Sequence, residues 1–190
     1  HLPPYQIVKD GQPLDGMAVQ IVRTLLTRVG VDVEIEVVPW ARAYDMALNR
    51  PNILIFSVLR SVEREELFYW VGDILTQEFS FFALSEEEGE EDDQEKSGRK
   101  RREVMTIRSF ADAKKYVTGV TRDSFEHQLL VKHRFIDERD LALNVRQQPL
   151  IDMLYKQHVD LLLGTKTVLR ALESAIKPGP SRLKQVYKVK

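Results

Sequence analysis

Apolar and polar residues alternate with two different periodicities along the chain, and together these periodicities predict an α/β protein. Over residues 16–29 the apolar side chains recur every three or four positions, which is the spacing of an amphipathic helix, and Gly30 provides its stop. Over residues 31–37 every second residue is apolar, which is typical of a strand with one face in water. The chain therefore offers a helix followed by a strand near its beginning.

The same succession of elements is predicted along the rest of the chain. In order, the pattern predicts an extended piece at 6–11, a helix at 41–48, a buried strand at 52–58, helical turns at 61–67, an extended crossing at 74–84, a capped helix start at Ser109, a strand at 116–121, a helix capped by Asp123, a strand at 141–145, a helix over 150–155, a strand at 159–163, a helix at 165–176 and a final strand from residue 183. This alternation predicts the α/β fold class with mainly parallel sheets. We place one lobe at residues 1–78 and a second at residues 79–190.

One segment, residues 85–102, differs from everything around it. It reads SEEEGEEDDQEKSGRKRR, an acidic block followed by a basic one without an apolar residue. Such a segment buries too little surface to offset its ordering entropy, so we expect a surface loop inserted into the second lobe. The alternative is a docking segment for a charged partner.

Composition narrows the classes of function. The 28 basic and 29 acidic residues nearly balance, so nothing indicates nucleic acid or a membrane surface as a partner. The absence of cysteine excludes disulfides, thiolate metal sites and a cysteine nucleophile, and the four histidines have no metal-ligand spacing. There is no HExxH, GxSxG, P-loop or Rossmann glycine signature, so we expect neither a catalytic site nor a cofactor.

The ends of the sequence also carry expectations. No apolar run approaches the roughly 20 residues of a membrane span, and the N-terminus lacks the pattern of a signal peptide. An exported protein would therefore be present here in its mature form. The abrupt start and end suggest a chain trimmed at both termini.

The most informative stretch is residues 56–72, FSVLRSVEREELFYWVG. A buried strand ends there, and Ser57, Arg60 and Arg64 follow within eight positions. Guanidinium groups present a planar fork of donors that matches a carboxylate or a phosphate, so the stretch suits an anion site. The alternative is that both arginines pair with neighbouring glutamates on a solvated turn, since such surface ion pairs are common.

A crevice between two α/β lobes would lie at the carboxyl ends of strands and the amino ends of helices. Free N–H groups and partial positive charge gather at those helix ends, which favours a small anionic or zwitterionic ligand. Trp40 could stack on such a ligand or pack on the rim of its own helix. The candidate ligand-binding residues are Tyr5, Trp40, Ser57, Arg60 and Arg64 from the first lobe and Arg122, Ser124 and Thr165 from the second.

Several of these motifs resemble a known family. Pro4-Tyr5, the helix after Gly16, PWARA at 39–43 and FSVLRSVEREELFYWVG resemble the first lobe of bacterial periplasmic solute-binding proteins of family 3, the amino-acid-binding type. SFADAKKYVTGVTRDS and MLYKQHVDLLLG resemble the second lobe, so the resemblance covers nearly the whole chain except the charged insertion. Ser61 and Asp73 depart from the family's usual threonine and proline. The resemblance implies a two-lobed type II periplasmic-binding-protein-like fold.

The resemblance also implies roles for individual residues. Arg64 matches the arginine that holds the ligand carboxylate, and Ser124 matches a helix-start position that donates to the same carboxylate. Trp40 and Ser57 match positions that often contact the ligand. Gly164-Thr165 stands where the family places a carboxylate for the amino group, so the ligand class stays open between amino acids and small organic anions.

The resulting expectation is a monomeric periplasmic protein that closes two lobes on a small polar solute by a hinge motion. Its partner would be an ABC transporter permease, and it would not be an enzyme. Two alternatives remain on the same fold. One is the ligand-sensing domain of a membrane receptor, and the other is a dehydratase or lyase.

Overall fold

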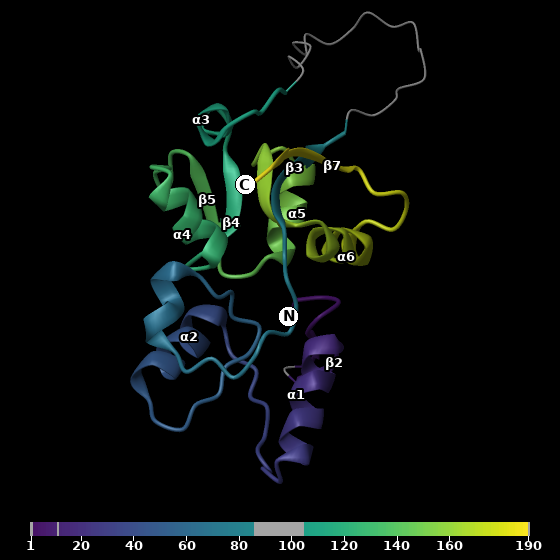
Figure 1. The fold of residues 1–190 in the computed structure, drawn as a ribbon. Coiled ribbons are helices and arrows are strands. Elements are labelled where there is room, and N and C mark those ends of the chain that lie inside the picture. The colour runs from purple at the N-terminus through teal and green to yellow at the C-terminus, as the bar shows by residue number, and fades with distance from the viewer. Residues whose placement is uncertain (1, 11, 86–104, 190) are drawn as a thin grey trace, which may run out of the picture.

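The computed structural model describes residues 2–10, 12–85 and 105–189, and a five-stranded sheet is its central feature (Figure 1). The strand order is β5-β4-β6-β3-β7. The strands are β3 (Phe79–Leu84), β4 (Thr118–Thr121), β5 (Leu141–Asn144), β6 (Leu161–Thr165) and β7 (Leu183–Lys188). β4 pairs in parallel with β5 and β6, whereas β3 runs antiparallel to β6 and β7. The sheet is thus mixed, with β3 as the strand that runs against the others.

Helices cover both faces of this sheet. Successive residues of each strand face opposite sides, so apolar residues in a row need cover on both faces. Leu161 and Leu163 face the side of α3 (Phe110–Ala113) and α4 (Phe125–Lys132), whereas Leu162 faces α5 (Gln148–Tyr155) and α6 (Lys166–Ile176). All three leucines are at most 4% exposed. Burying each one contributes about 1.5–3 kcal/mol relative to exposure, which explains why this run forms the central strand.

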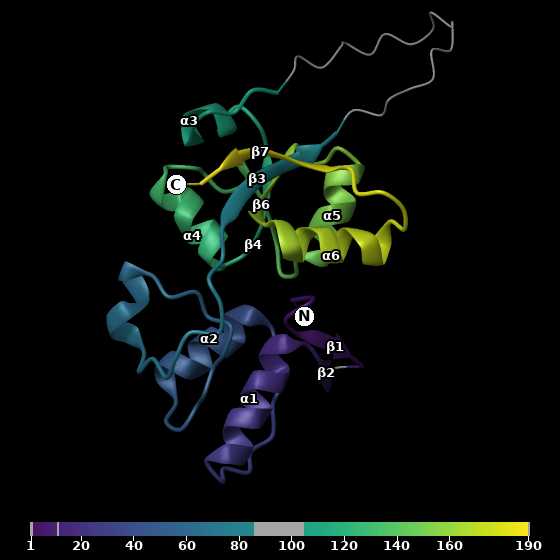
Figure 2. The ribbon, with the colours of Figure 1, turned by 45° about the vertical axis from the view of Figure 1, so that its right-hand side comes forward.

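The residues before β3 form a separate set of elements beside the sheet (Figure 2). They comprise a hairpin of β1 (Ile7–Lys9) and β2 (Gln12–Asp15), the helices α1 (Met17–Arg28) and α2 (Trp40–Asn49), and the 3-10 helix η1 (Val62–Leu67). The amphipathic helix predicted at 16–29 is confirmed as α1. The helical turns predicted at 61–67 are confirmed as η1.

Two strands predicted in this first part are not present. Residues 31–37 and 52–58 have no strand pairing in the structure, so the described part of the first lobe lacks the parallel sheet that we expected. Alternating apolar residues fix which side chains share a face, but a strand also needs a neighbour that completes its hydrogen bonds. The side chains reflect this, since Val33 is 52% and Leu54 71% exposed.

The N-cap of α4 also differs from the prediction. Ser124, not Asp123, caps the helix, and its hydroxyl accepts a hydrogen bond of 3.2 Å from the backbone N–H of His127. Asp123 instead has a φ of 57°, a left-handed conformation that aspartate tolerates better than most residues. This conformation turns the chain between β4 and α4 and leaves the cap to the next residue.

The remaining elements of the second lobe agree with the sequence pattern to within a few residues. Ser109 caps α3 as predicted, accepting a hydrogen bond from the backbone N–H of Asp112. The charged segment 85–102 lies outside the described residues apart from Ser85, so its predicted loop is not tested.

Candidate functional site

The carboxyl ends of three parallel strands meet at one edge of the sheet. β4, β5 and β6 end at Thr121, Asn144 and Thr165, and the helices α4, α5 and α6 begin within four residues of those ends. Figures 1 and 2 show α2 on the side of the sheet toward which the start of α4 points. This edge therefore places helix N-termini opposite the elements that carry Trp40 and Arg64.

Trp40 connects the two sides of this arrangement. It is the first residue of α2, and its indole Nε1 donates a hydrogen bond of 2.8 Å to the backbone carbonyl of Asp123. Asp123 lies in the turn immediately before Ser124, the N-cap of α4. The indole therefore lies at the start of α4.

Arg64 is the buried charge of the region. Its side chain lies in η1 and is only 2% exposed. The guanidinium carbon lies 5.0 Å from the ring centroid of Tyr44 and 5.7 Å from that of Trp40. These rings offer cation–π attraction, which strengthens when the cation is removed from water.

The hydrogen bonds of Arg64 are incomplete. Nη2 donates to Oε1 of Gln128 on α4 at 2.8 Å, and Nη1 donates to the carbonyl of Leu59 at 3.3 Å. Nε is buried and has no acceptor among the described residues. Among the described residues Arg64 has no ion pair with a carboxylate, although its charge acts on Glu126 and opposes the rise in the pKa of that carboxyl. A buried guanidinium with one unused donor is energetically unfavourable, so this group is suited to an anion from outside the protein.

Two other arginines show what a completed pairing looks like in this protein. Arg139 directs Nε and Nη2 to the two carboxylate oxygens of Asp140, at 2.8 and 2.9 Å. Arg60 directs the same two nitrogens to the carboxylate of Glu65. Only Arg64 of these three presents that edge to an amide oxygen with Nε unsatisfied. The structure thereby distinguishes Arg64 from Arg60, which the spacing alone left equivalent.

Arg60 follows the alternative interpretation of its motif. It is exposed, pairs with Glu65 and lies with its guanidinium 5.3 Å from the ring of Trp70. This is a solvated ion pair on its own turn. The structure gives Arg60 no contact with Trp40 or Arg64 among the described interactions.

The remaining candidates Thr165, Ser57 and Arg122 have different surroundings. Thr165 is 8% exposed, and its hydroxyl is buried without a described partner; Thr121 at the end of β4 has the same properties. Ser57 is half-buried with a φ of 59°. Arg122 is exposed and anchored through its backbone N–H to Asn144. These residues lie near strand or segment ends, but no described contact joins them to Arg64.

Tyr5 packs against the hydrophobic core of the second lobe. It packs, together with Leu2, against the core between the sheet and helices α5 and α6, although both residues precede the first lobe's helices. Its backbone carbonyl accepts a hydrogen bond of 3.1 Å from the N–H of Ala18 at the start of α1. Tyr5 thus joins the beginning of the chain to the second lobe's core.

Charged side chains lie near both ends of α4. Burial raises the pKa of Glu126, opposed by hydrogen bonds from its own backbone and from Ser124 and by the charge of Arg64. Lys132, at the last turn of α4, forms an ion pair with Glu63 of η1 at 2.6 Å. The hydrogen bond to Lys132 is the largest cause that lowers the pKa of Glu63 to about 2.

The sequence analysis missed two residues of this cluster. Gln128 follows Ser124 by four positions and Tyr44 follows Trp40 by four, so each lies one helical turn beyond a predicted site residue on the same face. That spacing is the signal that would have identified them.

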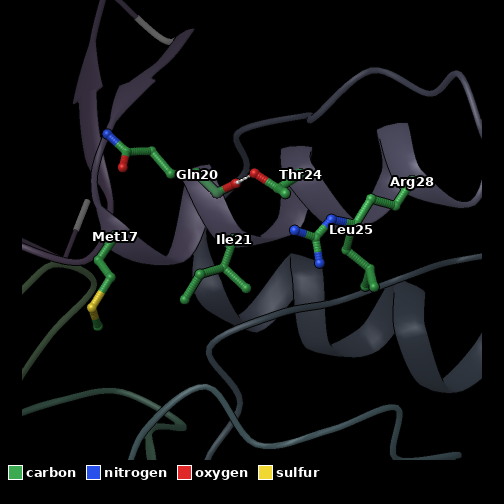
Figure 3. Close-up of a pocket in the computed structure, with 6 residues that line it drawn as sticks. All are labelled: Met17, Gln20, Ile21, Thr24, Leu25 and Arg28. Carbon is green, nitrogen blue, oxygen red and sulfur yellow. Dashed lines mark hydrogen bonds between the residues drawn. The ribbon is translucent and has the colours of Figure 1, made fainter.

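A separate hollow lies along the exposed face of α1 (Figure 3). Its walls are Met17, Gln20, Ile21, Thr24, Leu25 and Arg28. All six residues belong to one helix, and none is a predicted site residue. The hollow is therefore distinct from the cluster around Arg64.

Residues 2–10, 12–85 and 105–189 contain neither a membrane-spanning helix nor a metal-binding cluster. No helix there has the length and apolar character needed to cross a membrane. No group of three or more histidine, cysteine or acidic side chains in the same ranges would suit a metal ion.

Comparisons with known proteins identify the fold. No protein-family model matches the chain, and no curated protein sequence matches it. Among solved structures, an ancestral arginine-binding protein bound to arginine has a TM-score of 0.73 and 16% sequence identity, covering 99% of this chain and 75% of that one. An arginine third transport system periplasmic binding protein from Legionella pneumophila has a TM-score of 0.71 and 14% identity, covering 100% and 78%.

A third similar structure comes from a signalling protein. It is a histidine kinase sensor domain with similarity to periplasmic binding proteins, with a TM-score of 0.68 and 14% identity, covering 98% of this chain and 73% of that one. Together the three structures show that the chain has the two-lobed periplasmic-binding-protein-like fold. The resemblance read from the sequence motifs is thus confirmed at the level of fold.

Proposed function

We propose that this chain binds a small carboxylate-bearing solute, an amino acid or a small organic anion, between Arg64 and the N-terminal end of α4. The observation that carries the proposal is the buried guanidinium of Arg64, whose Nε has no acceptor among the described residues. A carboxylate presents two oxygens at the spacing of the Nε and Nη2 donors and neutralises the buried charge. A bound carboxylate therefore supplies what the protein leaves unpaired.

The surrounding residues have roles consistent with this ligand. The ring of Trp40 forms one wall, and the N-terminal end of α4 at Ser124 contributes partial positive charge. The buried hydroxyl of Thr165 is available to a polar group of the solute. In this proposal Ser57, Arg122 and Tyr5 shape the surroundings, and Arg60 belongs to the surface.

The fold is consistent with a biological setting in solute capture. Solved proteins of this fold include an arginine-binding protein bound to arginine and a periplasmic component of a transport system. We propose a transport function for this chain. It would capture a solute outside the cytoplasm, and the lobes 1–78 and 79–190 would close on the solute by hinge motion. The monomer would then deliver the solute to an ABC transporter permease. No catalytic step or cofactor belongs to the proposal.

A second candidate function is favoured by one observation. The histidine kinase sensor domain shares the fold at a TM-score of 0.68, so the same ligand site would serve a membrane receptor equally well. The full-length gene separates the two functions, because a receptor requires a membrane-spanning segment and a signalling domain in the same polypeptide.

Isothermal titration calorimetry tests the site. The ligands are L-arginine, L-glutamine, L-glutamate and succinate, which all carry a carboxylate and differ in net charge. Replacing Arg64→Ala should cost about 2–5 kcal/mol of binding free energy for any ligand that binds, because the variant removes a buried charged contact. Arg60→Ala is the matched control and should leave the dissociation constant unchanged. Equal effects of the two variants would contradict the site.

A further inference from the structure

The side chain of Gln128 reaches from α4 to the guanidinium of Arg64. Its Oε1 accepts from Nη2 at 2.8 Å, although the two residues lie 64 positions apart in the chain. Gln128 is an exposed residue, whereas Arg64 is buried. An exposed side chain thus covers one donor of a buried charge.

The donor that Gln128 occupies belongs to the edge that other arginines of this protein present to carboxylates. Arg139 uses Nε and Nη2 for both oxygens of Asp140, and Arg60 uses the same pair for Glu65. An amide has a single acceptor oxygen, so Gln128 fills only Nη2 and leaves Nε without an acceptor.

From this geometry we infer that Gln128 stands in for the ligand's carboxylate in the ligand-free protein and is displaced when the carboxylate binds Arg64. The inference rests on the proposed function and adds a residue that determines specificity. Displacement carries little cost, because the released amide is neutral and exposed and returns to water. A carboxylate gains the second hydrogen bond and the charge interaction that the amide lacks.

The same contact links the two lobes before ligand arrives. It lies beside the hydrogen bond from Trp40 to the Asp123 carbonyl and the ion pair between Lys132 and Glu63. A solute with a single weak acceptor offers nothing beyond what Gln128 already supplies. The site therefore selects for ligands with a carboxylate over neutral alcohols and amides.

Two substitutions of this residue should change affinity in opposite directions. Gln128→Ala removes the competitor and should lower the dissociation constant of carboxylate ligands by about three- to tenfold, the effect of one modest hydrogen bond. Gln128→Glu creates an internal carboxylate that engages both Nε and Nη2, and should raise the dissociation constant by at least about tenfold. Gln185→Glu, the same chemical change at an exposed position of β7, is the control and should change neither.

The measurements are calorimetry with L-arginine, L-glutamate and succinate, and NMR of the Arg64 Nε–H resonance during titration with the same ligands and with acetate. Thermal unfolding of each variant verifies that it folds. A purely structural role for Gln128 would lower stability in Gln128→Ala without raising affinity. The Nε–H resonance should shift on adding carboxylate to the wild type, and should already be shifted in ligand-free Gln128→Glu.

The possible outcomes distinguish the role inferred for Gln128 from the proposed ligand-binding function on which it rests. If Arg64→Ala abolishes binding but Gln128→Ala weakens it or leaves it unchanged, Gln128 is not a competitor and the inference is overturned while the function stands. If ligand binds equally well to Arg64→Ala, the proposed site itself fails. If no carboxylate perturbs Arg64 in any variant, both are overturned.

Discussion

Replacing Arg64→Met should separate folding stability from ligand binding. Methionine reproduces the aliphatic part of the arginine side chain to about the position of Nε, but it removes the buried charge and the contacts of the guanidinium with the rings of Trp40 and Tyr44. The substitution tests whether Arg64 is present for the fold or for a ligand.

The expected change in unfolding free energy is a difference between opposing terms. The variant loses one good hydrogen bond from a charged donor to Gln128, about 1.5–3 kcal/mol, and cation–π attraction of about 0.5–2 kcal/mol. It also removes a buried charge that forms no ion pair among the described residues and an Nε that lacks an acceptor there, which together cost several kcal/mol in the wild type. We therefore expect a stability within about 2 kcal/mol of the wild type, on either side.

Binding should respond quite differently. Loss of a direct charged contact costs about 2–5 kcal/mol, which is a rise in the dissociation constant of about 30- to 4,000-fold. Urea denaturation followed by circular dichroism gives the first quantity, and calorimetry with L-arginine or L-glutamate gives the second. Arg64→Ala serves as a comparison, because it adds a cavity and should destabilise by about 2–4 kcal/mol.

One result would refute this reasoning. If Arg64→Met lowers the unfolding free energy by more than about 3 kcal/mol, the guanidinium is a structural group whose contacts exceed its desolvation cost. Arg139→Met indicates the scale for a paired arginine, since it removes a completed bidentate interaction with the buried Asp140.

Three further predictions concern single groups. Burial first, and then the hydrogen bond to Glu173, raises the pKa of Tyr155 to about 12. The neutral phenol therefore stabilises the folded state fully below pH 10, and this contribution declines as the pH rises toward 12. Tyr155→Phe should flatten that decline in alkaline denaturation curves. In NMR titrations Glu63 should titrate near a pKa of about 2, and Lys132→Ala should return it toward 4.5; an unchanged value would exclude the ion pair. Ser124→Ala should destabilise by about 1 kcal/mol in urea denaturation through loss of the α4 cap, whereas Ser124→Asp should retain it.

The elements that the sequence predicted best are those whose pattern repeats within one element. The apolar spacing over 16–29 predicted α1, because a helix satisfies its own backbone hydrogen bonds and needs only one apolar face. The apolar run 161–163 was likewise placed in a strand, and burial on both faces explains its uniform hydrophobicity.

The predicted strands at 31–37 and 52–58 show the limit of this kind of inference. Residues 31–37 alternate clearly and residues 52–58 contain a continuous apolar run, yet neither segment pairs with another strand in the structure. A strand completes its hydrogen bonds only with a neighbouring strand, and the strand's own sequence does not specify which segment that neighbour is.

The candidate site divides in the same way. The sequence by itself predicted a carboxylate-binding site near Trp40 and Arg64, because both follow segments that read as strands and carry suitable chemistry. Spacing and chemistry did not distinguish Arg64 from Arg60, since both lie among glutamates, and only the family resemblance pointed to Arg64. Only the tertiary structure decided that Arg60 pairs with Glu65 and that Arg64 lies buried against Gln128, because burial and partners from distant segments depend on how the lobes pack.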